Sequence, residues 1–566
     1  MQYLNRNSVF RGVFFIFPFL YGLYYEFSAI LAGIFLCLFL LWTVWEQKTI
    51  YFCKHKVIWI LAAVIAWYGV AAIYGIDSGM AFLGFLKKFP LLLFGIVWMQ
   101  FSKEEKEKIW RQIPWMGSVM TVFSAFGWLI PAVYSHVFVA GRMSGCFQYA
   151  NTFACFLLLG LICLFYKQTK VAADWGCMAV LIFGILCSGS RTVMLLLLLV
   201  CAYVVIQRKA WKYGIGAVAA MVVLGILTFF IPALEQTAGR LFTSSIHAST
   251  MLGRFLYMMD ALKLLKSHFF GMGAGGYEYV QGTVATGFYQ VRYVHNDFLQ
   301  IGLDIGVIPM IIVVGVVLWG IITCKDKQNR LVLLVLALHG LVDIDMEYMI
   351  MPLIFLMAMP VWEGKEQVKC SLQRKKLAGF TALTVCVALL QLPFLVATVL
   401  EYNDRHPEAL AWYPAYTQAR ENYAYDLQNV EDIEDVQELR AQAQQLVKTN
   451  IYSRTGYQML ALCDYVTGNY ASMMEQEEKA ISLLPFYTEE YETYATYLIS
   501  ALAQCAEEEQ NEETEALLLT LENLPEKMKE RKNKRSNLGK QIKDQPSLEL
   551  SKDVRNDIKT LKQMYQ

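Results

Sequence analysis

Long apolar runs fill residues 9–400, whereas residues 401–566 alternate between charged and apolar positions at helical spacing. Because a membrane-spanning helix needs about 20 mostly apolar residues, the first part predicts a bundle of transmembrane helices. We predict an all-α, polytopic bundle of about 12–13 spans, followed by a helical domain outside the membrane. The predicted spans are 9–25, 28–45, 57–75, 79–100, 112–133, 149–166, 174–188, 190–206, 213–231, 297–322, 331–346, 348–362 and 377–400.

Basic residues in the loops predict the orientation, because cytoplasmic loops of membrane proteins collect Lys and Arg. Every second loop is basic if the N-terminus is cytoplasmic, and the loops around Asp77 and Asp343 between them have no basic residue. The basic loops hold Lys48, Lys54, Lys56; Lys103, Lys106, Lys108, Arg111; Lys167, Lys170; Arg208, Lys209, Lys212; Lys325, Lys327, Arg330; and Lys365, Lys369, Arg374, Lys375, Lys376. We therefore expect a multi-pass protein of the bacterial cytoplasmic membrane, with residues 134–148, 188–191, 232–296 and 401–566 on the outer face.

The C-terminal region contains a weak repeat. Pro485 follows Ala480 by five positions, and the turn Gly468-Asn-Tyr470 precedes both; Ala409 and Pro414 have the same spacing, about two tetratricopeptide periods earlier. Between them Ala443 fits, but Lys448 occupies the proline position. We predict tetratricopeptide-like repeats over 401–505, with an unrelated helical bundle as the alternative. Residues 506–566 change from acidic to basic, which predicts a charged and partly disordered tail.

Composition narrows the function classes. The chain has 566 residues, is 56% hydrophobic and has a formal net charge of +1, so nothing indicates nucleic-acid binding. Thirteen cysteines fall mostly inside apolar runs and show no ligand spacing, so we expect no metal site and no cofactor. The first apolar run lacks a cleavage site and is expected to remain as a membrane helix.

Arg191 is the clearest candidate for chemistry, since a charged residue at membrane depth is costly and often functional. It follows Ser188, Gly189 and Ser190, which break two apolar runs. A guanidinium at the start of a helix is suited to a phosphate, although an Arg that only anchors the helix end would fit the same pattern.

The loop 232–296 offers further candidates. Arg254 begins an amphipathic segment, and the glycine-rich turn after His268 includes Gly271 and Gly273, whose amides could approach a phosphate or simply form a loop. The loop ends at His295 and Asn296, directly before an apolar run. An interfacial histidine can act as a base near neutral pH or contact lipid headgroups.

Three segments together resemble the O-antigen ligase and polymerase family of membrane glycan ligases. They are the stretch from Gly141-Arg142 to Asn151, the stretch Ser188-Gly-Ser-Arg191-Thr, and the loop with Arg254, the His268 turn and the His295-Asn296 pair. The resemblance covers about residues 60–360, and a tetratricopeptide-like tail is familiar in the family. It implies a GT-C-like membrane domain over 1–400 and a metal-independent transfer of glycan from an undecaprenyl-diphosphate carrier to an acceptor hydroxyl.

The same resemblance implies roles for individual residues. Arg191 and Arg254 would hold the diphosphate with Arg142 assisting, His295 would deprotonate or position the acceptor, and Asn296 would orient it. Ser190 and Gly273 belong to the matching motifs and are further expected substrate contacts. Lys87, inside a predicted span beside Lys88, faces either the lipid diphosphate or a water-filled cleft.

Other classes remain open at this point. A transporter or flippase of envelope precursors also has many spans and buried basic residues, although no repeated halves are visible. A scaffold that recruits a protein partner through the repeats is a further alternative. Within the favoured class the acceptor remains undecided among a glycan, as in a polymerase, a lipid or wall glycan, as in a ligase, and a protein, as in an oligosaccharyltransferase.

Overall fold

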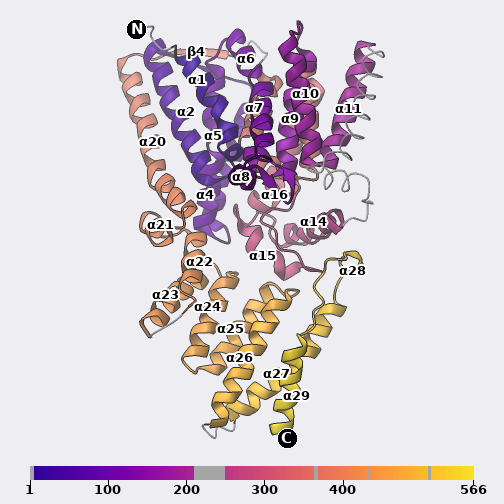
Figure 1. Ribbon diagram of the computed structural model, residues 1–566. Coiled ribbons are helices and arrows are strands. Elements are labelled where there is room, and N and C mark those ends of the chain that lie inside the picture. Colours follow the sequence, from indigo (N-terminus) through magenta and orange to yellow (C-terminus); the bar gives the residue numbers. More distant parts are fainter. Residues whose placement is uncertain (1–4, 210–248, 363–366, 430–432, 508–511, 566) are drawn as a thin grey trace.

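The computed structural model describes residues 5–209, 249–362, 367–429, 433–507 and 512–565, and the predicted span 213–231 and the start of the loop 232–296 lie outside them. A bundle of apolar helices carries the N-terminus, and a column of C-terminal helices extends from one end of it (Figure 1). The protein is an all-α, polytopic membrane protein. The bundle consists of α1 (Arg6–Ile16), η1 (Phe17–Phe19), η2 (Tyr21–Leu23), α2 (Glu26–Gln47), α3 (Lys56–Tyr74), α4 (Ser78–Lys88), α5 (Pro90–Met99), α6 (Lys103–Trp110), α7 (Ile113–Phe126), α8 (Pro131–Val137), η3 (Gly145–Phe147), α9 (Ala150–Tyr166), α10 (Ala172–Ser188), α11 (Arg191–Arg208), α14 (Ser249–Ser267), α15 (Gly276–Val284), α16 (Asp297–Ile305), α17 (Val307–Thr323), α18 (Lys327–Gly340), η4 (Asp345–Glu347), α19 (Ile350–Ala358), η5 (Pro360–Trp362) and α20 (Arg374–Tyr402).

Five helical segments of the described chain are long and apolar enough to cross a membrane: α2, α3, α4 with α5, α11 and α20. Three shorter apolar helices, α9, α10 and α17, lie beside them. The exposed faces of these helices carry large apolar side chains such as Trp59, Ile73 and Leu195, which is the arrangement expected where lipid replaces water.

The predicted span 297–322 is not one helix, and this expectation is wrong. The chain forms α16 and then α17, separated at Gly306, whose φ of +101° belongs to the left-handed region where glycine is favoured. A Cβ atom at Gly306 would lie 2.7 Å from the carbonyl carbon of Phe270, so the backbone of the preceding loop also requires glycine there. Apolar composition alone cannot reveal this break.

The predicted spans 331–346 and 348–362 are also shorter as helices. At 1.5 Å per residue, α18 is about 21 Å long and α19 about 14 Å, less than the hydrocarbon thickness of a bilayer. The two helices are antiparallel, and their connection holds Asp343, Asp345 and Glu347, all buried. This connection, residues 341–349, is called the acidic tip below.

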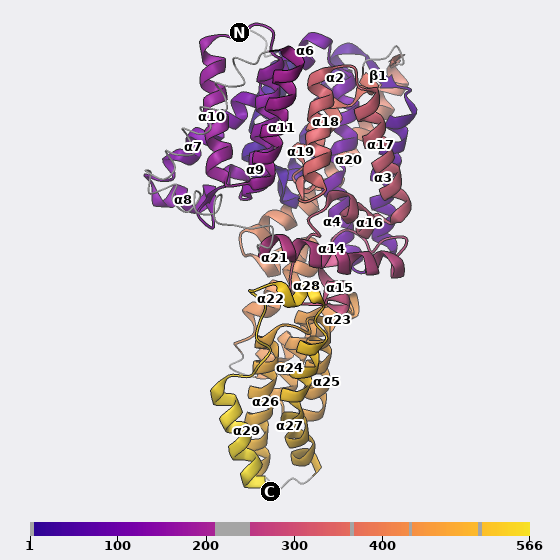
Figure 2. The same ribbon diagram turned by 90° about the vertical axis from the view of Figure 1, so that its right-hand side faces the viewer.

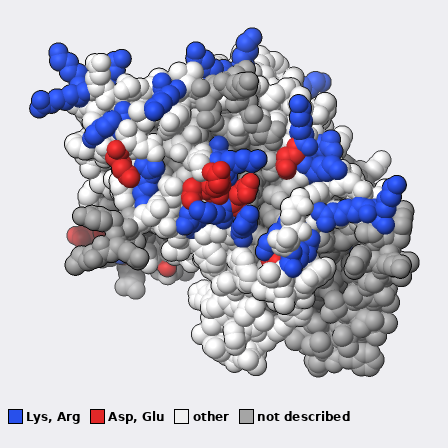
Figure 3. Space-filling model, turned by 90° about the horizontal axis from the view of Figure 1, so that it is seen from above, with Lys and Arg blue, Asp and Glu red and all other residues white. Residues whose placement is uncertain are grey.

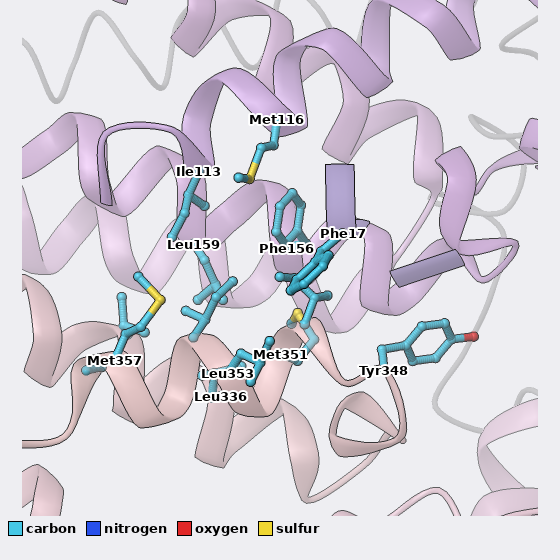
Figure 4. Close-up of a cluster of buried hydrophobic side chains, with 14 of the residues drawn as sticks. Phe17, Ile113, Met116, Phe156, Leu159, Leu336, Tyr348, Met351, Leu353 and Met357 are labelled. Atoms are coloured by element: carbon cyan, nitrogen blue, oxygen red, sulfur yellow. The ribbon is translucent and has the colours of Figure 1, made fainter. Parts of the chain in front are cut away.

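The main core lies where α7, α9, α18 and α19 meet, as the buried side chains in Figure 4 illustrate. Small residues allow the close approach. A Cβ atom on Gly184 of α10 would lie 2.6 Å from both Leu157 of α9 and Thr121 of α7. The tight packing fixes α9, whose first turn bears Asn151 and Thr152.

Two short strand pairs lie at the ends of the bundle. β1 (Thr49–Cys53) pairs antiparallel with β4 (Gln367–Ser371) at the end that also carries α6, and this end is called the basic end. Lys and Arg side chains gather on its surface (Figure 3). β2 (Phe138–Val139) pairs with β3 (Arg142–Met143) at the opposite end, which faces the C-terminal helices and is called the repeat-facing end.

The C-terminal column consists of α21 (His406–Trp412), α22 (Thr417–Asp426), α23 (Ile433–Thr449), α24 (Arg454–Val466), α25 (Tyr470–Leu483), α26 (Thr488–Glu507), α27 (Glu512–Asn533), α28 (Asn537–Gln541) and α29 (Lys552–Tyr565). Ala409, Ala443 and Ala480 lie on α21, α23 and α25, and each is fully buried. The expected tail forms α27, α28 and α29, and Leu517 and Leu521 of α27 are buried in the same apolar cluster as α26.

The column is packed closely on the loop of the bundle, and Figure 2 shows α15 and α28 between the two parts. A Cβ atom on Gly282 of α15 would lie 1.6 Å from the carbonyl oxygen of Leu483, at the end of α25. Gln545, after α28, exchanges two hydrogen bonds with the backbone of Phe288. The repeat-facing end is therefore in direct contact with the C-terminal column.

Candidate active site

Two of the three predicted motif segments are joined by Arg142. Its Nε donates to the carbonyl oxygen of Ser188 at 2.7 Å, and its Nη2 donates to Oδ1 of Asn151 at 2.6 Å. β3 supplies Arg142, and the end of α10 supplies Ser188. Arg142 thus holds the helix start at Arg191 against the start of α9.

Arg191 is the first residue of α11 and its side chain is exposed. Gly189, with a φ of +60°, ends α10 and turns the chain, and Ser190 is the buried residue before α11. Among the described residues, no hydrogen-bond or ion-pair partner is found for the Arg191 side chain. Its guanidinium therefore stands beside the free N–H groups of a helix start, where an anion is stabilised.

Arg254 of α14 enters the same site through Asp343 of the acidic tip. Its Nη1 lies 3.3 Å from Asp343 Oδ2 and donates to the carbonyl oxygen of Val342 at 2.6 Å. Its Nη2 donates to the hydroxyl of Tyr149 at 3.3 Å. The Arg254 side chain retains 17% of its exposure, whereas that of Asp343 is fully buried.

Asp343 contacts Tyr149, Asn151 and Arg254 and so connects the residues of this site. Its Oδ1 accepts from the hydroxyl of Tyr149 at 2.5 Å, and its Oδ2 accepts from Nδ2 of Asn151 at 2.8 Å. Burial by itself would raise the pKa of Asp343, but Arg254 and the hydrogen-bond donors around it lower the pKa below its usual value. A charged Asp343 therefore joins the start of α9 to α14.

His295 occupies a left-handed conformation, with φ of +52°, directly before α16. Its Nδ1 lies 2.9 Å from the carbonyl oxygen of Tyr293, which can only accept, so Nδ1 carries the proton and Nε2 keeps its lone pair. The ring lies between the rings of Tyr149 and Tyr257, at centroid distances of 6.5 and 5.5 Å. Burial lowers the pKa of His295, against the opposing effect of Asp343.

Asn296 caps the helix that follows His295. Its Oδ1 accepts from the backbone N–H of Leu299 at 2.9 Å, and its Nδ2 donates to the carbonyl oxygen of Leu341 at 2.9 Å. The side chain thus fixes the position of His295 relative to the acidic tip. Its expected role in orienting an acceptor stays a prediction.

Lys87 reaches the acidic tip through Glu347, whereas Gly273 belongs to the turn before α15. Lys87 is buried, and it pairs with Glu347 at 3.2 Å, as does Lys88 at 2.7 Å. Gly273 donates its backbone N–H to the carbonyl oxygen of Asp304, and a Cβ atom on it would lie 2.8 Å from Ala81. In the structure Gly273 packs the turn against α4, and its amide is already engaged.

The sequence reasoning missed the acidic tip as part of the site. Asp345 accepts from the hydroxyl of Thr152 and lies 2.5 Å from Nδ1 of His339, which is fully buried. Three acidic residues within five positions, between two apolar runs, are the signal in the sequence that indicates it. Tyr149, one position before α9, was likewise not singled out.

Cys155, His339 and Asp345 place potential metal-ligand atoms within 4.8 Å of one another, and all three are buried. A structural zinc site normally has four protein ligands. The hydrogen bonds of Asp345 with His339 and Thr152 already account for the arrangement without an ion.

Residues 176–314 match the family model described as O-antigen ligase, a stretch that begins in α10, ends in α17 and includes Arg191, Arg254 and His295. Arg142 and Asp343 lie outside it. No curated protein sequence matches the chain.

Proposed function

Because this multi-pass membrane protein belongs to the O-antigen ligase family through residues 176–314, we propose that it transfers a saccharide from undecaprenyl diphosphate to an acceptor hydroxyl on the outer face of the cytoplasmic membrane. The family match supports glycosyl transfer in general. The proposal for this particular site rests on one observation. The contacts Ser188–Arg142–Asn151–Asp343–Arg254 bring four distant segments of the chain together beside His295.

The leaving group is the part of the reaction that these arginines suit. When the bond between C1 of the donor sugar and the diphosphate oxygen breaks, negative charge accumulates on the diphosphate. Arg191 and Arg254 would stabilise this charge, because preorganised cations need little rearrangement in the transition state. Asp343 and the carbonyl of Val342 fix the direction of Arg254, so its remaining donors are presented to the substrate.

His295 would act on the acceptor. Its Nε2 would take the proton of the acceptor hydroxyl as the oxygen attacks C1, and the polyprenyl diphosphate would depart from the opposite face of the sugar. The anomeric centre would therefore be inverted. A lowered pKa keeps the imidazole neutral and able to accept a proton at physiological pH. Two arginines would carry out the charge stabilisation that a divalent cation provides in other transferases, so the reaction is expected to continue in chelator.

The distribution of charge supports the proposed orientation. Exposed Lys103, Lys108 and Arg111 belong to the basic end, which Figure 3 views directly. The positive-inside rule puts such a surface in the cytoplasm. The N-terminus would then be cytoplasmic, and the candidate site and the C-terminal column would be extracytoplasmic.

The C-terminal column is proposed to guide the acceptor, whether that acceptor is a glycan, a lipid or a protein. Ala409, Ala443 and Ala480 are buried in successive helix pairs, as small residues are in tetratricopeptide repeats. The column also contacts α15 of the same loop that supplies Arg254 and His295. Unchanged transfer after deletion of residues 401–566 would remove this part of the proposal.

The test is transfer by purified protein from an undecaprenyl-diphosphate-linked glycan in EDTA. We expect the wild type to be active, Arg191→Ala and His295→Ala to lose at least about 100-fold in rate, and Lys108→Ala on the basic end to match the wild type. An inactive wild type with every donor tried, or full activity in both site variants, would contradict the proposal and favour transport of envelope precursors.

A further inference from the structure

The basic end contains a large concavity, far from the proposed transfer site along the bundle. It has a volume of about 1060 Å³, comparable to the largest small-molecule sites of proteins. It lies among α6, the ends of α5, α9 and α19, and the starts of α7, α10 and α18. Trp98, Trp110, Trp115 and Trp362 contribute to its walls, and we call it the basic-end basin.

The acidic groups of the basic-end basin are all engaged within the protein. Both carboxylate oxygens of Asp174 lie 2.7 Å from Nζ of Lys167. Asp326 caps α18 by accepting from the backbone N–H of Asn329 at 2.8 Å. Glu107 of α6 lies 3.5 Å from Arg111, the residue that follows this helix.

Lys106 differs from Lys167 and Arg111, which pair with acidic residues, and from Lys103, which is exposed. No hydrogen-bond or ion-pair partner for its ammonium group is found among the described residues. Nζ lies 5.5 Å from the ring centroid of Trp98 and 5.9 Å from that of Trp362. Burial lowers the pKa of Lys106 to about 8, against a smaller opposing effect of Cys53.

The unpaired Lys106 lowers the stability of the protein when no ligand is bound. An ammonium group that loses part of its hydration without gaining an anion destabilises the fold. The two aromatic faces offset this only in part, since a cation–π contact is weaker than a buried ion pair. An anion that entered the basin would pair with Lys106 and recover the lost interaction.

We propose that the basic-end basin is a binding site for a phosphate group, with Nζ of Lys106 as its central contact and the rings of Trp98 and Trp362 as its walls. The site is separate from the one proposed for glycan transfer. A phosphate fits because it offers several acceptor oxygens to a group with three donors. Exposed Lys103 on the same helix would favour the approach of an anion.

Two sources of the phosphate are compatible with the geometry. Tryptophan is enriched where a membrane meets water, and basic residues near a membrane attract anionic lipids, so the group can belong to a lipid headgroup. The basin also opens toward solution, where a free phosphate can enter. The chemistry of the contact with Lys106 is the same in both cases.

The experiment measures equilibrium binding to the full-length purified protein in a detergent that lacks phosphate. The probes are dioctanoyl phosphatidylglycerol, dioctanoylglycerol, which is the same lipid without the phosphate-bearing headgroup, and inorganic phosphate. The variants are Lys106→Met, which keeps the length of the side chain, and Lys106→Arg, which keeps the charge. Lys108→Met is the matched control, because Lys108 is about half exposed and pairs with Glu105.

We expect wild type, Lys106→Arg and Lys108→Met to bind phosphatidylglycerol with similar affinity, and Lys106→Met to bind it at least 10-fold more weakly. We also expect Lys106→Met to have a higher melting temperature without ligand, since the unpaired charge is gone. Binding of inorganic phosphate with the same dependence on Lys106 would identify the free anion as sufficient, and its absence would identify the lipid. Equal binding by Lys106→Met, or equal binding of dioctanoylglycerol, would overturn the proposal.

Discussion

Replacement of Asp343 by asparagine is the most informative single change in the proposed site. Asparagine has nearly the same size and keeps one acceptor oxygen, but it removes the charge that faces Arg254 at 3.3 Å. It also places a donor NH₂ group opposite either the Tyr149 hydroxyl or Nδ2 of Asn151, both of which donate to Asp343 now.

The magnitude follows from burial. Asp343 is fully buried, and removing one partner of a buried ion pair costs about 3–5 kcal/mol. Arg254 retains 17% of its exposure and its bond to the Val342 carbonyl, so the lower end of this range applies. If about 3 kcal/mol is lost from the positioning of Arg254, transfer slows by about 100-fold, since 1.36 kcal/mol corresponds to a factor of ten.

The assay is the initial rate of glycan transfer at saturating donor, with folding checked by the melting temperature of each variant. Asp404→Asn is the matched control, because Asp404 is exposed and lies in the left-handed region, which asparagine also tolerates. Arg254→Ala and the double variant Arg254→Ala/Asp343→Asn complete a thermodynamic cycle. Because Asp343 acts through Arg254, we expect the double variant to be little worse than Arg254→Ala. Fully additive losses, or a rate within threefold of wild type for Asp343→Asn, would refute the reasoning.

Three further predictions concern the pH dependence of transfer, the contact between the bundle and the C-terminal column, and the pH dependence of stability. Because burial lowers the pKa of His295, the transfer rate should begin to fall with decreasing pH only below pH 6.5. Asp343→Asn should lower this pH further, since the Asp343 carboxylate opposes the effect of burial on the His295 pKa. A fall in rate centred at or above pH 6.5 would contradict this prediction. Gly282→Ala has no room beside the C-terminal column and should increase proteolysis between the two parts, whereas Gly379→Ala, with no atom within 4 Å, should not. Burial raises the pKa of Glu421 to about 8, above its unfolded value, so its charged form is disfavoured on folding and stability is lost as pH rises from about 4.3 toward 8. Glu421→Gln should therefore melt higher than wild type at pH 8 but not at pH 5, and equal melting curves at pH 8 would contradict the prediction.

The apolar pattern predicted much of the fold. Continuous apolar runs indicate α2, α3, α11 and α20 directly, because a helix surrounded by lipid must satisfy its own backbone and present apolar side chains on every face. The same pattern failed at Gly306, since a helix break buried within protein leaves the composition apolar. The apolar pattern also failed to predict the acidic tip, where the two short helices α18 and α19 meet.

The residues of the proposed site also differ in how readily the sequence alone reveals them. Arg191, Arg254 and His295 stood out because charged residues beside apolar runs are uncommon, and their positions could be read one segment at a time. Asp343 could not be identified in this way, because its importance comes from contacts with Asn151 and Arg254, which are distant in the chain. Lys87 shows the converse, since a buried basic residue that looks available in the sequence is paired with Glu347 in the fold.

The most direct test of the central claim is to measure the amounts of both products that form in a single turnover. Purified wild-type protein in EDTA is incubated with an undecaprenyl-diphosphate-linked glycan labelled in both the lipid and the sugar, together with acceptor. The account predicts that free undecaprenyl diphosphate and glycosylated acceptor appear in equal amounts, with inverted anomeric configuration, and that Arg191→Ala slows both by at least about 100-fold. Release of neither product by the wild type, or the same rate in Arg191→Ala, would contradict it.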